Sequence, residues 1–140
     1  MNFKEIHIGT LINHRVTESG IDISRICHFL KCEEDEVQRM YETHSLDTEI
    51  LLRWSKLLEY DFFRIYSQHL ILYAPSAAGD GFPKSHRSRL PQFRKNIYTR
   101  EVIDFMLEQI TSGNMTKKQV MEKYNIPKTT LYKWISKYER

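Results

Sequence analysis

Residues 74–97 interrupt the helical pattern of the sequence, and this interruption limits what the protein can fold into. Three of the chain's four prolines and two of its five glycines lie there. The same stretch shows no amphipathic period, and proline and glycine favour turns over helices. We therefore expect a flexible linker at 74–97, with residues 1–73 and 98–140 each folding around a small core of its own.

Both flanking parts have the apolar spacing of helices, and neither alternates apolar and polar residues for long enough to form a strand. In the first part we expect five helices, of which Asp22 and Asp47 can cap the second and the fourth. In the second part Thr116 and Gln119 form a capping box, and Pro127 suits the start of the last helix. The pattern predicts an all-α protein.

The charge is divided unevenly between the two halves. Residues 1–73 have a net charge of −4 and residues 74–140 a net charge of +7. Such asymmetry favours a polyanionic partner for the basic half, although a solvated basic surface would give the same count. The linker residues expected to contact phosphates are Lys84, Arg87, Arg89, Arg94 and Lys95.

The last two expected helices and the short turn between them form a helix-turn-helix. Leu131, Trp134 and Ile135 lie on the apolar side of the final helix, so its opposite side and its first turn are available to the major groove. No acidic residue lies between Lys123 and Tyr138. The expected DNA-binding residues are Lys117, Lys118, Lys128, Thr129, Thr130, Tyr132, Lys133 and Lys137.

Several motifs in residues 98–138 keep a characteristic mutual spacing. They are an opening Tyr-Thr, a glycine before the second helix, Tyr-x-Ile at the turn and Thr-Leu-Tyr-x-Trp in the final helix. In these features the segment resembles the helix-turn-helix of insertion-sequence transposase helper proteins. The resemblance implies that Lys128, Thr129, Thr130, Tyr132 and Lys133 face DNA. Pro127 departs from the pattern, because such proteins often have a capping serine there.

The first part carries the apolar spacing of a second helix-turn-helix, from Ile8-Gly9 through Ile26-Cys27 and Val37 to Trp54. In this spacing it resembles the five-helix domain of phage repressors of the lambda repressor and Cro type. That resemblance implies a DNA-reading third helix, and members of the family commonly present polar or basic residues on it.

Here the third helix opens instead with four acids, Glu33 to Glu36. Acids stabilise a helix N-terminus through its dipole, but they repel the phosphates that flank a groove. We therefore expect this unit to keep the fold without reading DNA. It would instead pair subunits or dock on a basic partner protein.

The fifth expected helix has more apolar residues than one face of a small domain needs. It either fills the core or joins two copies of the chain into a homodimer, whose two-fold symmetry would suit paired half-sites on DNA. The residues expected to make this dimer or partner contact are Phe62, Phe63, Tyr66, Leu70 and Tyr73.

Other functional classes find little support. Cys27 and Cys32 fall at apolar positions and predict buried free thiols rather than a metal site, and the six histidines show no metal-ligand spacing. No nucleophile motif, carboxylate pair or phosphate loop suggests an enzyme or a cofactor. No apolar run reaches the ~20 residues that cross a bilayer, so we expect a cytoplasmic protein.

The sequence thus predicts a sequence-specific protein for double-stranded DNA, with transcription regulation as its simplest role. Two alternatives stay open. One is a DNA-recognition subunit related to transposase, and the other is a protein-interaction adapter that does not bind DNA. In the adapter, the lysines around Thr129 would pack against acids of the N-terminal part.

Overall fold

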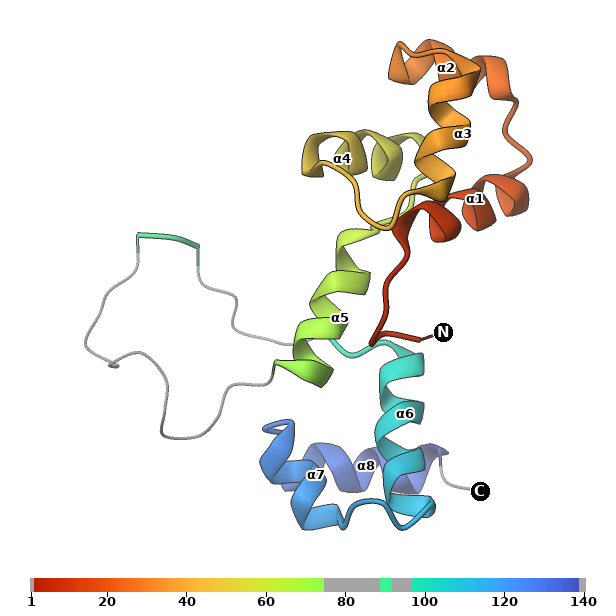
Figure 1. Ribbon diagram of the computed structural model, residues 1–140. Coiled ribbons are helices and arrows are strands. Elements are labelled where there is room, and N and C mark those ends of the chain that lie inside the picture. The colour runs from red at the N-terminus through yellow and green to blue at the C-terminus, as the bar shows by residue number, and fades with distance from the viewer. Residues whose placement is uncertain (1, 75–88, 92–96, 139–140) are drawn as a thin grey trace. The chain divides into compact units, whose positions relative to one another are not determined.

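The computed structural model describes residues 2–74, 89–91 and 97–138 (Figure 1). These residues form α-helices and no β-strand, so the all-α prediction is confirmed. None of the described helices has both the length and the apolar character needed to cross a membrane. The helices are α1 (Ile8–Ser19), α2 (Ile23–Leu30), α3 (Glu34–Glu42), α4 (Thr48–Leu57), α5 (Phe63–Tyr73), α6 (Arg100–Thr111), α7 (Lys117–Lys123) and α8 (Lys128–Tyr138).

The chain divides into two compact units, residues 2–66 and residues 67–140. This division falls inside α5, whereas the sequence pattern predicts that the first part ends at residue 73. The first turn of α5 therefore belongs to the N-terminal unit, and the rest of α5 belongs to the C-terminal unit.

In the N-terminal unit, α1 packs against α3, and α2 packs against both α3 and α4. Apolar side chains from all four helices, together with Phe62 just before α5, fill the core of this unit. The most deeply buried of them are Ile8, Ile12, Ile26, Val37, Trp54 and Phe62.

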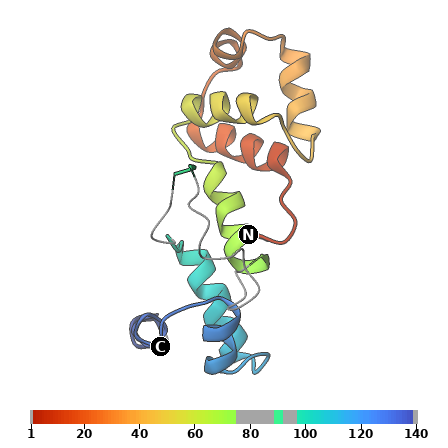
Figure 2. The same cartoon turned by 90° about the vertical axis from the view of Figure 1, so that its left-hand side faces the viewer.

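Gly9 allows the first turn of α1 to meet the C-terminal end of α3 (Figures 1 and 2). The amide of Gly9 donates to the carbonyl of Thr43 at 3.1 Å, and the amide of Ile8 donates to that of His44 at 3.2 Å. Two amides that a helix start would leave unpaired are thus satisfied. A Cβ on Gly9 would lie only 2.3 Å from the carbonyl oxygen of Met40, so this approach requires glycine.

The two expected aspartate caps have different outcomes. Asp47 caps α4 as predicted, because its carboxylate accepts from the amide of Glu49 at 2.8 Å. Asp22 occupies the N-cap position of α2 but makes no side-chain cap. Its carboxylate accepts from the hydroxyl of Ser24 instead. The capping role predicted for Asp22 is therefore wrong.

Near the start of the C-terminal unit, the side chain of Gln68 is buried and only 3% exposed. Its amide nitrogen donates to the carbonyl of Ile97 at 2.7 Å, and its carbonyl oxygen accepts from the amide of Thr99 at 3.2 Å. Thr99 is the N-cap of α6, so Gln68 fixes the entry to that helix from α5. Tyr73 adds an edge contact to the ring of Phe105, with 6.4 Å between centroids.

The three remaining helices pack against one another around a second core, seen in the lower part of Figure 1. Each of α6, α7 and α8 contacts the other two, which leaves the outer faces of α7 and α8 available. The buried residues of these helices and of the turn before α8 are Val102, Ile103, Met106, Leu107, Val120, Tyr124, Ile126 and Leu131.

The apolar residues in and just before α5 differ in how deeply they are buried. Phe62, just before the helix, is 1% exposed and fills the N-terminal core, so it is not offered to another molecule. Phe63 and Tyr66 are half-buried. Leu70 and Tyr73 are 58% and 39% exposed, and they remain the surface residues of the five expected to make a dimer contact.

Replacing Gly9 by alanine should destabilise the N-terminal unit by about 3 kcal/mol or more, because the new methyl group meets fixed backbone atoms. Gly20 provides the matched control. It ends α1 with φ +66°, and a Cβ there meets nothing within 4 Å. Gly20→Ala should cost only about 1 kcal/mol, the strain of a left-handed alanine. Denaturant unfolding of both variants measures the difference, and equal losses would contradict the close approach.

Replacing Gln68 by leucine should destabilise the C-terminal unit by about 2–4 kcal/mol, because the Ile97 carbonyl and the Thr99 amide lose their partner. Amide hydrogen exchange measures this directly, since the Thr99 amide should lose its protection. The exposed Gln38 gives the control, and Gln38→Leu should leave exchange in α6 unchanged. Full protection of Thr99 in Gln68→Leu would show that the side chain does not fix this entry.

Candidate nucleic-acid interface

The turn between α7 and α8 sets the direction of α8. The capping box predicted at the start of α7 is confirmed, with the Thr116 amide donating to the Gln119 side chain at 2.8 Å and the Gln119 amide to the Thr116 hydroxyl at 3.2 Å. After α7, Asn125 adopts the left-handed conformation at φ +51°, and Ile126 turns back into the core. This sequence of conformations brings α8 across α6 and α7.

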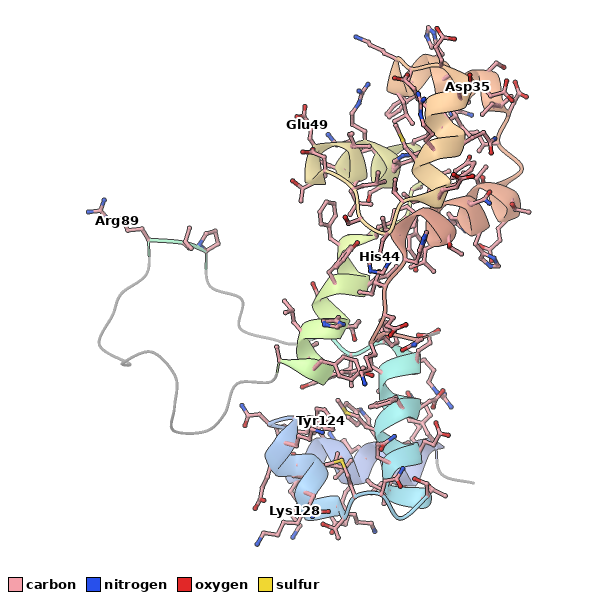
Figure 3. All side chains as sticks on the ribbon, viewed as in Figure 1. Asp35, His44, Glu49, Arg89, Tyr124 and Lys128 are labelled. Atoms are coloured by element: carbon pink, nitrogen blue, oxygen red, sulfur yellow. The ribbon has the colours of Figure 1, made fainter. Side chains whose placement is uncertain are left out.

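Pro127 precedes α8, and its carbonyl accepts from the amides of Thr130 and Leu131 at 3.0 and 3.1 Å. Its ring has no oxygen with which to cap the helix, in contrast to Thr116 before α7. The amides of Lys128 and Thr129 in the first turn are therefore left to water or to an anion. Figure 3 shows Lys128 at this end of the unit.

The two sides of α8 differ sharply in composition. Leu131 is fully buried, while Trp134 and Tyr138 are half-buried, and Trp134 meets the ring of Tyr98 edge-on at 5.0 Å. On the outer side, all the expected DNA-contacting positions are exposed except Thr130, which is half-buried. The exposed residues are Lys128, Thr129, Tyr132, Lys133 and Lys137, together with Lys117 and Lys118 at the start of α7.

Electrostatic contacts distinguish these lysines from one another. The ammonium groups of Lys117 and Lys128 lie 5.4 and 5.6 Å from the centroid of the Tyr132 ring. Lys118 instead approaches the carboxylate of Glu122 at 3.9 Å, so part of its charge is already compensated. The structure thus brings two of the predicted residues together from different helices, a grouping that helical periodicity alone did not predict.

In the N-terminal unit, α3 starts very differently from α8. The carboxylate of Glu36 accepts from the amide of Glu33 at 2.9 Å and completes a capping box at the start of α3. Glu34 and Asp35 are exposed in the same turn, and Figure 3 shows Asp35 at the surface. These acids give α3 a stable beginning, and they present negative charge at the end that a DNA-reading helix would offer to a groove.

Cys27 and Cys32 lie beside a shallow open recess between the end of α2 and the start of α3, with a volume of about 460 Å³. Both are free and half-buried, so the prediction of buried thiols holds only in part. Burial raises the pKa of the Cys32 thiol, and the neighbouring Cys27 and Glu36 raise it further. Within the described residues, no group of three or more potential ligands could hold a metal ion.

The predicted linker contacts are mostly beyond what the structure describes. Lys84, Arg87, Arg94 and Lys95 lie outside the described residues. Arg89 is described, and its side chain is exposed (Figure 3).

Comparison with known proteins assigns no family to this chain. No family model, curated protein or solved structure matches it significantly.

Asn125 offers a test of the turn that directs α8. Asn125→Gly should leave the free energy of unfolding within about 0.5 kcal/mol of wild type, because glycine adopts φ +51° readily. Asn125→Val should cost about 2 kcal/mol, since a β-branched residue is strained there. Denaturant unfolding compares the two variants. If valine were tolerated as well as glycine, the left-handed turn would not be needed.

Proposed function

We propose that this protein binds double-stranded DNA sequence-specifically through α7 and α8 and acts as a regulator of transcription. The observation that carries the proposal is the outer face of α8. This face presents Lys128, Lys133 and Lys137 to solvent, and none of residues 128–138 is acidic. A helix of this kind suits the major groove, whose walls are lined by phosphates.

Each part of the helix has a role that follows from its position. The first turn of α8, with its free amides and Lys128, approaches a phosphate, to which the helix dipole also contributes. Thr129 is exposed beside it and can meet a base edge or a thymine methyl group. Lys133 and Lys137 lie further along the same face and contact the backbone, which fixes the helix in the groove without reading sequence.

The N-terminal unit would serve this function without contacting DNA. Its α3 begins with carboxylates where a DNA-reading helix needs positive or neutral groups. Leu70 and Tyr73, on the part of α5 that belongs to the C-terminal unit, supply exposed apolar area that supports pairing of two chains into a homodimer. Two C-terminal units would then meet two half-sites, as palindromic operators require.

The exposure of Lys128, Thr129 and Lys133 within the C-terminal unit supports DNA binding over the adapter, in which these lysines would pack against acids of the N-terminal part. A DNA-recognition subunit related to transposase would use the same face in the same way. A strand-transfer enzyme encoded beside this chain would favour transposition over transcription.

Removing two lysines from α8 tests the proposal. The full-length Lys128→Ala/Lys133→Ala variant should bind duplex DNA more weakly, and the slope of log affinity against log salt should become shallower by about 2, because two phosphate contacts are lost. Fluorescence anisotropy of a labelled duplex between low and physiological salt measures both quantities.

The matched control removes the same amount of charge from the N-terminal helix-turn-helix. Arg25 and Arg39 are exposed on α2 and α3, and Arg25→Ala/Arg39→Ala lowers the net charge equally. This variant should keep the wild-type salt slope. If it lost as much slope as the lysine variant, α3 would contact DNA despite its acids. If wild type bound no duplex even at low salt, the adapter would replace the present proposal.

A further inference from the structure

On the outer surface of the helix-turn-helix, side chains from α7 and α8 meet at the ring of Tyr132. Tyr132 lies in the second turn of α8 and is 45% exposed, so its ring contributes little to the core. Lys117 reaches this ring from the first position of α7, and Lys128 reaches it from the first position of α8. Both lysines are exposed.

Two like charges beside one ring need a physical explanation. Two ammonium groups repel each other, and each long side chain loses conformational freedom when it is held in place. The negative face of an aromatic ring attracts cations within ≈ 6 Å of its centroid, which offsets part of this cost. The remaining repulsion is relieved when an anion binds between or beside the two ammonium groups.

We propose that Tyr132 is a positioning residue that holds Lys117 and Lys128 as a pair for the DNA phosphate backbone. This inference rests on the proposed function and names the chemical group that this part of the site recognises. Each DNA strand carries one negative charge per ~3.4 Å of helix axis, so two lysines gathered at one ring meet the same short stretch of backbone. In this role Tyr132 acts through its ring.

Two substitutions of Tyr132 distinguish an effect of the aromatic ring from a direct contact by the hydroxyl group. Tyr132→Phe keeps the aromatic face and should bind duplex DNA within about two-fold of wild type. Tyr132→Leu keeps a side chain of similar bulk but removes the face, and it should bind roughly ten-fold more weakly. Both variants are made in the full-length protein and measured by fluorescence anisotropy at one fixed salt concentration.

A double-mutant cycle identifies the lysines that depend on the ring. Lys117→Ala should weaken binding about five-fold in the wild-type background and less than two-fold in the Tyr132→Leu background. Lys118 gives the control, because it is the next residue and approaches Glu122 instead of the ring. The cost of Lys118→Ala should be the same in both backgrounds.

A second measurement needs no DNA. In proton NMR spectra of the free protein, ring currents should shift the side-chain methylene signals of Lys117 and Lys128 upfield in wild type and in Tyr132→Phe. The shift should vanish in Tyr132→Leu. This result would stand even if wild type bound no duplex, so failure of the proposed function and failure of the ring contact are distinguishable.

Three results would overturn the inference. Tyr132→Phe binding as weakly as Tyr132→Leu would assign the role to the hydroxyl group. Tyr132→Leu binding as tightly as wild type would show that the ring positions nothing. Absence of the upfield shifts in wild type would show that neither lysine rests on the ring in solution.

Discussion

Every α-helix carries positive potential at its N-terminus, and α3 and α8 place charges of opposite sign there. In α3 it is neutralised by acids, and the Glu36 carboxylate is bound to the backbone of Glu33. In α8 it is left open after Pro127, and Lys128 adds to it. The starts of α3 and α8 thus differ in the charge that they offer to a partner, and this difference supports the proposed division of labour between the two units.

Much of the fold could be predicted from the sequence because local signals agree with one another. The apolar spacing predicts the helices, and the Thr116–Gln119 box marks the start of α7 where the structure has it. Asp47 caps α4 for the same local reason. Asp22 is an exception, because a hydroxyl two residues away competes for its carboxylate. The residue type identifies a capping position, whereas the group that the capping side chain binds depends on the conformation of that side chain.

Helical periodicity could not predict the contacts between residues far apart in the sequence. Gln68 lies between Ile65 and Leu72 on the buried side of α5, and a polar residue in such an apolar row indicates a buried hydrogen bond. Its partners lie 29 and 31 residues further along the chain, so no local pattern names them. The pairing of Lys117 with Lys128 was missed for a related reason, since it depends on how α7 and α8 cross.

The hydrogen bonds of Gln68 hold the start of α6 directly on α5. Because Ile97 and Thr99 are bound by a side chain 29 and 31 residues earlier in the chain, the register of α6 against α5 is set by this side chain and not by the distance along the chain between the two helices.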